Sequence, residues 1–415
     1  MKKWLSLGLA ALLCLSFVAC GTQNGAGSSP DVSPSDESEI PASSGESLPS
    51  EGEPESSAES SAESVEILET EPVTYTLNKK SPVKVTGRTT KVSEGITLDH
   101  SAASLTFQAK CYGDVSVKME ASAGVIFVPF IDGVRQATRV YFDPDHAEAV
   151  VAAGLEKGIH TIRLVRDTQE KKGSCTAISI TMTGSFADKP KNASTYIEFI
   201  GDSITCGHGS LHGFLTEQDQ LTVLERKNTI CVDPTSAEPL FEESATNSYG
   251  FLTAEALGAD SGFYCYSGIG LAKGLVPFNM DEYFRYTSQL RGQLYNFVNP
   301  RVPDLVVINL GTNDSGVATP PSKEEYKAAV IALIQEVRTL YGKEDLKIVW
   351  TTGMMGKAFG KYAEEAIQSL NDENLYVHLY LPEGTSGHGS HPDLLQHQKA
   401  ADDLVKFIQD NHILG

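Results

Sequence analysis

The spacing of hydrophobic and polar positions changes near Asp188 and divides the structured part of the chain into two halves. Between Val73 and about Lys189, short runs such as VSVKMEA and HTIRLVRD alternate apolar with polar residues, and Gly, Asp or Asn separates many of them. Short alternating segments without helical periods between them are typical of a β-sandwich. We therefore predict an N-terminal β-sandwich, jelly-roll-like, over residues 73–189.

From residue 190 onward, apolar runs alternate with helical periods. We expect strands at YIEFI, GFYCY, DLVVINL, KIVWTT and LYVHLYL, and helices near residues 249–257, 281–298, 322–340, 361–370 and 393–408. This alternation predicts a parallel sheet covered by helices on both faces. The chain is thus expected to be multi-domain, with a three-layer α/β domain over residues 190–415. In such sheets, reactive groups gather at the carboxyl ends of the strands.

The first residues have a pattern of their own. Lys2 and Lys3 precede an apolar segment, residues 4–18, that is short for a bilayer span, and small residues lead up to Cys20. This is typical of a bacterial lipoprotein signal peptide, so we expect residues 1–19 to be removed and Cys20 to carry lipid. The lipid would anchor the protein at the extracellular face of the cell membrane. An ordinary signal peptide with an incidental cysteine is the alternative.

Residues 20–72 are predicted to be a disordered acidic tether rich in Ser and Pro. From residue 21 onward this segment holds thirteen Asp or Glu and no Lys or Arg, so it contributes −13 to the formal net charge of −21. Such a composition buries too little apolar surface to offset chain entropy. The signal contributes +2, which leaves −10 for residues 73–415. A mildly acidic folded part disfavours nucleic-acid binding and suits neutral substrates.

The cysteines leave several possibilities open. Of seven, five would remain after loss of Cys14 and lipidation of Cys20. No CxxC pair occurs, so a structural zinc site is not expected. An odd number leaves at least one thiol unpaired within the chain. The remaining five cysteines admit free thiols or two disulfides, Cys111 with Cys175 and Cys206 with Cys231.

The stretch EFIGDSITCGHGS places a serine at the end of an apolar run. Ser203 follows the expected strand through Gly201 and Asp202, where a glycine permits a tight turn, so its hydroxyl would lie at the carboxyl end of the sheet. A serine is a weak nucleophile unless a base takes its proton. His391, in the loop after LYVHLYL, is the candidate base because it lies at the same edge of the sheet. A surface role is the alternative.

Two further loops reach this edge. The run GFYCYSGIG leads into Gly268, and DLVVINLGTND leads into Asn313. An ester hydrolase needs hydrogen-bond donors for the developing oxyanion, and backbone N–H groups together with an asparagine amide provide them. The alternative is that each glycine loop is simply a turn.

The blocks GDSI, SG, GTND and HP occur in the order of the SGNH (GDSL-type) esterases, which the C-terminal half resembles. The resemblance implies that Ser203 is the nucleophile and His391 the base. It also implies an oxyanion hole formed by the N–H groups of Ser203 and Gly268 and the amide of Asn313. No cofactor and no metal ion are implied.

The front half, with VIFVPFIDG and GLEKGIHTIRLVRDTQE joined directly to this domain, resembles the two-domain acetyl esterases of carbohydrate esterase family 2. That resemblance implies a carbohydrate deacetylase, such as an acetylxylan esterase, whose partner is an acetylated glycan. We further expect a monomer that does not bind nucleic acid.

One departure from the commoner SGNH pattern concerns the base. Many members carry an aspartate three residues before the catalytic histidine, where this chain has His388. A backbone carbonyl would orient the imidazole instead, so we predict a Ser203–His391 dyad. Asp393 and Glu383 are the alternative acids.

A second departure is a long polar stretch between His208 and Asn247. It is longer than a typical loop, and it is expected to be either a lid or substrate wall beside Ser203 or a surface insertion.

Other functions remain as alternatives on this sequence. An SGNH lipase, thioesterase or lysophospholipase is the main alternative, and an inactive glycan-binding surface lipoprotein is another. His388, His391 and His397 suggest a metal, but the HExxH spacing is absent and Pro392 would break a helix between them. We expect His397 to face outward from the last helix. No G-x-S-x-G elbow or phosphate-binding G-x-x-x-x-G-K loop occurs.

Overall fold

The antiparallel sheet of the N-terminal half begins where the expected strands begin. The structure, a computed structural model, describes residues 70–90, 92–220, 240–356, 359–379 and 386–415. The predicted signal peptide, Cys20 and all but the last residues of the tether lie outside these ranges. None of the helices in the described ranges is both long and apolar enough to cross a membrane.

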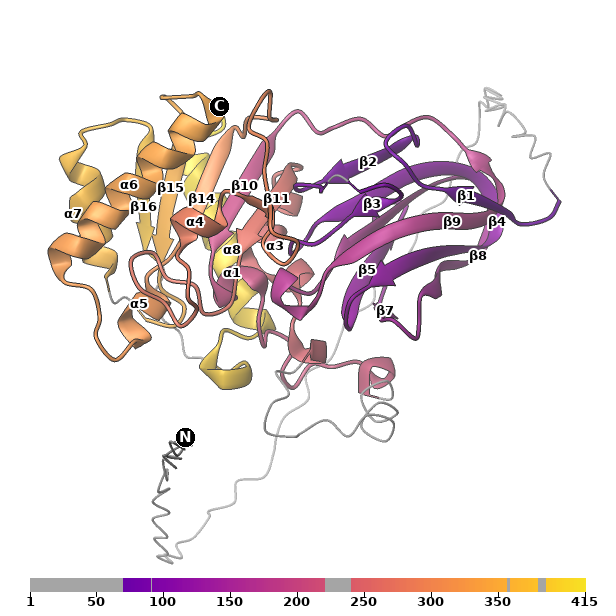
Figure 1. Ribbon diagram of the computed structural model, residues 1–415, viewed down its shortest axis with the longest axis horizontal. Helices are drawn as coiled ribbons and strands as arrows, with labels where there is room; N and C mark the ends of the chain where they lie inside the picture. The colour runs from indigo at the N-terminus through magenta and orange to yellow at the C-terminus, as the bar shows by residue number, and fades with distance from the viewer. Residues whose placement is uncertain (1–69, 91, 221–239, 357–358, 380–385) are drawn as a thin grey trace, which may run out of the picture. The chain divides into compact units, whose positions relative to one another are not determined.

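Nine strands form this sheet, and every pairing between them is antiparallel. They are β1 (Val73–Thr76), β2 (Val83–Thr86), β3 (Ile96–Thr97), β4 (Ser104–Ala121), β5 (Val125–Ile131), β6 (Val134–Arg135), β7 (Val140–Phe142), β8 (Glu148–Arg166) and β9 (Cys175–Phe186). The prediction of β structure is confirmed (Figure 1). The jelly-roll sandwich and the domain boundary at residue 189 stay predictions.

The alternation of apolar and polar residues in the sequence corresponds to alternating buried and exposed side chains in the strands. In β4, Val115, Val117 and Met119 are fully buried, while Lys118 and Glu120 between and after them are exposed. Side chains of a strand point to opposite faces in turn, so the apolar set forms one core. The runs SLTFQAK and VSVKMEA, expected as two strands, are one long strand whose register shifts between Cys111 and Ser116.

The second sheet has five parallel strands in the order β11-β10-β14-β15-β16. They are β10 (Tyr196–Gly201), β11 (Asp260–Cys265), β14 (Leu305–Asn309), β15 (Lys347–Thr352) and β16 (Leu375–Leu379). Within the described residues, the helices of this half are α1 (Ser203–Cys206), α3 (Tyr249–Ala256), α4 (Met280–Tyr283), α5 (Thr312–Gly316), α6 (Lys323–Tyr341), α7 (Gly360–Ser369) and α8 (Leu394–Asp410), with single 3-10 turns η2 (Leu240–Glu242), η3 (Ala245–Asn247) and η4 (His388–Ser390). A further 3-10 turn, η1 (Glu170–Lys172), lies between β8 and β9 of the N-terminal sheet. The predicted parallel sheet is confirmed.

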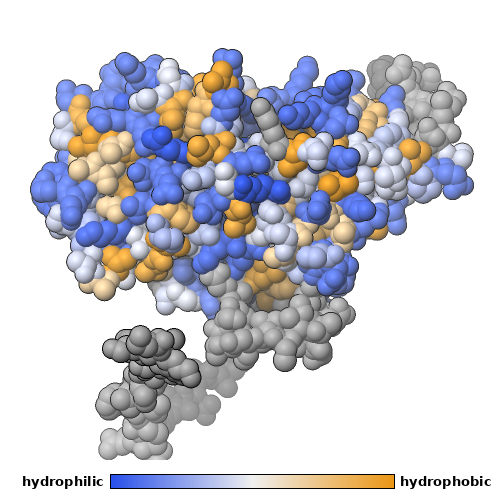
Figure 2. Space-filling view, in the orientation of Figure 1, coloured by the Kyte–Doolittle hydropathy of each residue, from blue (hydrophilic) through white to orange (hydrophobic). Residues whose placement is uncertain are grey.

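Helices cover both faces of this sheet (Figure 1). Phe199 of β10 packs in one apolar cluster with residues of α3 and α8, such as Tyr249 and Leu404. Its neighbour Ile200 points to the other face and packs with residues of α6 and α7. Strands buried on both sides explain the nearly continuous apolar runs in the sequence. On the molecular face shown in Figure 2, hydrophilic residues predominate and hydrophobic ones are dispersed among them.

The helix expected at 281–298 is wrong. This segment forms only α4 (Met280–Tyr283), followed by the small hairpin of β12 (Tyr286–Ser288) and β13 (Gln293–Leu294). The reason lies in Glu170, a buried residue of the N-terminal half. Its Oε1 accepts hydrogen bonds from the Ser288 hydroxyl at 2.7 Å and from the Leu290 N–H at 3.1 Å. These contacts with a buried carboxylate override a helical period that sequence alone suggests.

The two halves are joined through buried polar contacts, and Glu63–Gly415 form one compact unit. The Arg139 guanidinium pairs with Asp167 of its own half at 3.1 Å and with Asp219 of the other at 3.1 Å, and it donates to the Glu243 carbonyl at 3.0 Å. Arg88 lies buried against a set of aromatic rings, Tyr264, Phe284, Tyr295 and Phe297. Residues of the N-terminal half thus reach the loops at the edge of the parallel sheet.

The cysteines within the described residues are unpaired and buried: Cys111, Cys175, Cys206 and Cys265. A disulfide between Cys111 and Cys175 is therefore not formed. Cys231, the other expected partner of Cys206, lies outside the described residues.

Candidate active site

Ser203 lies at the carboxyl end of β10, as its sequence position predicts. Gly201 ends the strand, and a Cβ atom there would come within 2.0 Å of the Thr205 hydroxyl, so the turn requires glycine. Asp202 caps the short helix α1, because its Oδ1 accepts the Ile204 N–H at 3.0 Å. Ser203 is 5% exposed. The chain therefore holds this hydroxyl in one place at a largely enclosed position.

The structure brings His391 to this hydroxyl. His391 Nε2 lies 2.8 Å from Ser203 Oγ, and His391 Nδ1 lies 3.0 Å from the backbone oxygen of His388. A carbonyl oxygen can only accept, so Nδ1 carries the proton and Nε2 offers its lone pair to the serine hydroxyl. This is the tautomer that a general base requires.

The surroundings of His391 favour its neutral form. Burial and the neighbouring His208, whose ring centroid lies 4.7 Å away, lower the pKa of His391 to about 4. The hydrogen bond to the His388 carbonyl acts in the opposite direction. The imidazole is thus unprotonated at neutral pH.

Asn313 lies next to the Ser203 turn, at the start of α5. Its Nδ2 donates to the Ile269 carbonyl at 2.8 Å and makes a longer contact of 3.4 Å with Asp202 Oδ2. The second contact exceeds the usual N–H···O range, so one hydrogen of this amide is only loosely held. Burial raises the pKa of Asp202 to about 7, although the hydrogen bond from the Ile204 N–H acts to lower that pKa.

The loop that carries Gly268 is fixed by a buried carboxylate. Asp314 Oδ2 accepts the Leu271 N–H at 2.8 Å, and its Oδ1 accepts those of Ala272 and Lys273 at 2.7 and 2.9 Å. Gly268 itself has φ +90°, a conformation that favours glycine. Thus the two loops expected to hold oxyanion donors contact each other through Asn313 and Asp314.

The part of the chain that carries the parallel sheet is similar to a known family. Residues 197–384 match the family model described as GDSL-like lipase/acylhydrolase. This segment is therefore similar to GDSL-type hydrolases. Ser203, Gly268 and Asn313 lie within the matched segment, and His391 lies seven residues beyond its end.

Two curated relatives are similar to the chain. Residues of this chain are 30% identical over 279 positions to the cellulase/esterase CelE of Acetivibrio thermocellus, which covers 63% of this chain and 31% of CelE. They are 24% identical over 350 positions to an acetylxylan esterase/glucomannan deacetylase of Cellvibrio japonicus. That alignment covers 81% of this chain and 91% of the relative. The chain thus spans under a third of CelE and most of the second relative.

The fold is also that of solved carbohydrate esterases. A family two carbohydrate esterase from Clostridium thermocellum, in complex with cellohexaose, superposes with a TM-score of 0.69 at 24% identity, covering 80% of this chain and 99% of that one. Since the alignment covers 80% of this chain, the order of an antiparallel sheet followed by a parallel sheet is shared with that structure.

Sequence reasoning missed a row of residues behind the base. His208 Nδ1 lies 3.5 Å from Glu243 Oε2, and that carboxylate also accepts from the side-chain amide of Gln169 at 2.7 Å. Gln169 Oε1 in turn accepts the Ser267 N–H, beside Gly268, at 2.9 Å. Burial would raise the pKa of Glu243, but His208 and Lys172 lower it below its usual value. The only signal available was the position of Gln169 two residues after the expected strand HTIRLVRD.

Of the two alternative acids, Asp393 lies within the described residues and makes no hydrogen bond with His391 there. Asp393 caps α8: its Oδ1 accepts the Gln396 N–H at 3.0 Å, and its Oδ2 bonds the Ser386 hydroxyl. Glu383 lies outside the described residues. His397, expected to face outward, is fully buried instead and accepts the Tyr249 N–H at 3.1 Å. Burial lowers the pKa of His397 to about 3, so it packs as a neutral side chain between α8 and α3.

The described ends of the long polar stretch pack near the site. The Leu211 N–H donates to the Glu242 carbonyl at 2.9 Å, and Asp219 pairs with Arg139. Residues 221–239 lie outside the described residues, so the choice between a lid and an insertion stays a prediction.

Proposed function

We propose that this chain is a serine esterase that removes O-acetyl groups from polysaccharides or oligosaccharides through a Ser203–His391 dyad. The observation that carries the proposal is the 2.8 Å contact between His391 Nε2 and Ser203 Oγ in a GDSL-type domain. The similarity to an acetylxylan esterase/glucomannan deacetylase supports a carbohydrate ester as substrate. Among the described residues, no carboxylate bonds His391 Nδ1, which supports a dyad.

In the first half of the reaction, Ser203 Oγ attacks the acetyl carbonyl carbon while His391 Nε2 takes the hydroxyl proton. The carbonyl oxygen becomes an oxyanion, which the N–H groups of Ser203 and Gly268 and the amide of Asn313 stabilise. The His388 carbonyl accepts from Nδ1 throughout and stabilises the imidazolium.

The ester bond then breaks, and the sugar hydroxyl leaves with the proton from His391. Water attacks the acetyl-serine as His391 takes one of its protons, and acetate departs when that proton returns to Ser203 Oγ. The chemistry uses side chains and backbone donors only.

The proposal includes the location of the enzyme and its N-terminal half. Lipid at Cys20 would hold a monomeric enzyme at the extracellular face of the membrane, with residues 20–72 as a tether, and this rests on the sequence pattern alone. We also propose that residues 73–189 form a jelly-roll-like sandwich domain, which the antiparallel pairing supports.

Acetate release from acetylated xylan and acetylated glucomannan tests the function. The full chain should release acetate, and Ser203→Ala should lower kcat by at least about 10³-fold, because the nucleophile is gone. Ser315→Ala serves as a matched control, since this exposed hydroxyl donates to the Thr312 carbonyl of its own turn. Equal acetate release by wild type and Ser203→Ala would show that Ser203 is not the nucleophile. Hydrolysis confined to long acyl esters would favour a lipase.

A further inference from the structure

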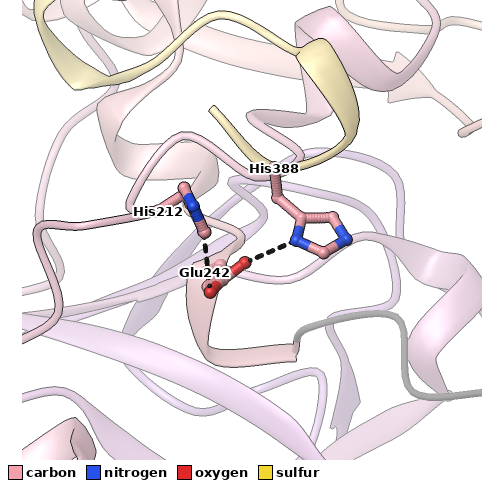
Figure 3. Close-up of side chains that lie close together, drawn as sticks. All are labelled: His212, Glu242 and His388. Carbon is pink, nitrogen blue, oxygen red and sulfur yellow. Dashed lines mark hydrogen bonds and ion pairs between the residues drawn. The ribbon is translucent and has the colours of Figure 1, made fainter. Parts of the chain in front are cut away.

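Three side chains that the esterase mechanism does not use converge beside the base. His212 Nδ1 lies 3.0 Å from Glu242 Oε1, and His388 Nδ1 lies 3.0 Å from Glu242 Oε2. One ligand atom from each residue falls within 4.8 Å of the others. Figure 3 shows the two imidazole rings directed at opposite oxygens of one carboxylate. We call these three residues the His212–Glu242–His388 cluster.

One carboxylate oxygen in the cluster lacks a proper donor. Glu242 Oε2 is buried, and none of the described residues gives it a hydrogen bond of acceptable geometry, although His388 Nδ1 is near. A buried carboxylate oxygen without a donor is costly, and a cation satisfies it as well as a hydrogen bond does. The side chains of His212 and His388 are 50% and 43% exposed, so an ion can reach the cluster from solvent.

The backbone holds the three residues in place before any ligand arrives. The Leu211 N–H donates to the Glu242 carbonyl at 2.9 Å, and the His388 N–H donates to the Gly209 carbonyl at 3.1 Å. Gly209 has φ +68°, and a Cβ atom there would come within 2.8 Å of the His388 Cβ. Only glycine lets these two segments approach so closely. The cluster is therefore built on a preorganised frame.

We propose that the His212–Glu242–His388 cluster binds a Zn²⁺ ion through the two Nδ1 atoms and the Glu242 carboxylate, with water completing the coordination. Two histidines and one carboxylate form a donor set that Zn²⁺ accepts, with bonds near 2.0 to 2.2 Å. Tetrahedral ligands at such bond lengths lie roughly 3.3 Å apart, close to the 3.0 Å contacts present. Each imidazole binds as the neutral ring with its proton on Nε2.

The donor set also selects among cations. Ca²⁺ and Mg²⁺ prefer six or more oxygen ligands, whereas imidazole nitrogens suit late first-row transition metals. We therefore expect Zn²⁺ to bind and millimolar Ca²⁺ or Mg²⁺ not to compete. This site differs from the histidine set weighed in the sequence, since His391 and His397 take no part.

The ion would join three segments that frame Ser203. His212 belongs to the turn after α1, Glu242 to η2, and His388 to η4. The backbone carbonyl of His388 orients His391. The role of the ion would be structural, because no reacting atom of the proposed ester hydrolysis bonds these side chains. The inference does not depend on the ester chemistry, so either can fail alone.

The test uses the full chain, purified without a polyhistidine tag and stripped with a chelator. Isothermal titration with ZnCl₂ should give a stoichiometry near one, and thermal melts should shift upward with added Zn²⁺. His212→Gln, Glu242→Gln and His388→Gln should each weaken Zn²⁺ binding by at least about tenfold, because even the loss of a ligand's outer hydrogen-bond partner usually costs about that much. His160→Gln, on the N-terminal sheet, is the matched control.

Circular dichroism of the stripped variants separates lost ligands from misfolding, and three variants on separate segments keep the test open if one fails to fold. The site is supported if the wild type and the His160→Gln control bind Zn²⁺ equally well and the folded cluster variants bind it more weakly. No saturable Zn²⁺ binding by the wild type, or undiminished binding by the cluster variants, overturns it.

Discussion

The two loops that flank Ser203 are held by different means. The loop of residues 266–274, on the side of the proposed oxyanion hole, is bound by the Asp314 carboxylate, which is fully buried and accepts three backbone N–H groups. The loop of residues 386–391, on the base side, orients His391 through one neutral backbone carbonyl. The side chain of His388 in that loop is 43% exposed.

This difference indicates where the site is rigid. A buried carboxylate with three donors makes charge-assisted hydrogen bonds, which are roughly twice as strong as neutral ones. Oxyanion donors must be in place before charge develops, since their value lies in preorganisation. A base that is already neutral and holds the correct tautomer needs only an acceptor for Nδ1, so a carbonyl suffices. The comparison predicts large losses on the oxyanion side and small ones for the acid near the base.

Replacement of Asn313 should have the largest effect of the three substitutions that test this comparison. Asn313→Ala removes the side-chain donor, so kcat for an aryl acetate should fall by about 10²- to 10³-fold. Steady-state kinetics would measure it, with the exposed Asn296→Ala as control. A loss of less than tenfold would mean that Asn313 does not meet the oxyanion.

Replacement of Asp314 should act through position. Asp314→Asn keeps the shape but turns an N–H group toward one of three backbone donors, so the free energy of unfolding should fall by roughly 1–3 kcal/mol. As the loop of residues 266–274 loosens, kcat should drop while KM changes little. Urea unfolding and kinetics check both, against the exposed Asp345→Asn. Unchanged stability and kcat would show that the three hydrogen bonds do not hold the loop.

The smallest effect is expected for Asp393. Asp393→Asn preserves a good helix N-cap, and no hydrogen bond joins this residue to His391, so kcat should stay within about twofold of wild type. The orienting acid of a triad would instead cost about 10⁴-fold on the same change. A measured loss near that larger value would make Asp393 the acid of a catalytic triad. It would contradict the interpretation that the His388 carbonyl alone orients His391.

Much of the frame follows from local pattern. The five parallel strands, the helix expected near residues 322–340, and the positions of Ser203 and His391 at strand ends all follow from short stretches of sequence. Their proximity could be inferred because the carboxyl ends of parallel strands share one edge. The roles assigned to them stay predictions until kinetics are measured.

What could not be inferred depends on contacts between distant segments. The hairpin at 286–294 forms because Glu170, more than a hundred residues earlier, accepts hydrogen bonds from the Ser288 hydroxyl and the Leu290 N–H. His397 looked like a surface residue because a charged or polar side chain on a helix is usually exposed, yet it accepts a backbone N–H from α3. The Gln169–Glu243–His208 row likewise spans both halves, so no local spacing reveals it.

The proposed ester hydrolysis passes through one covalent step at Ser203, and trapping the acetyl-serine tests it most directly. Enzyme mixed with an aryl acetate, quenched in acid within the first turnovers and digested, should yield one acetyl group on the peptide that contains Ser203. The acetyl-peptide should not accumulate in His391→Gln. Rapid turnover with no acetyl on Ser203, or with acetyl on another side chain, would contradict the proposal.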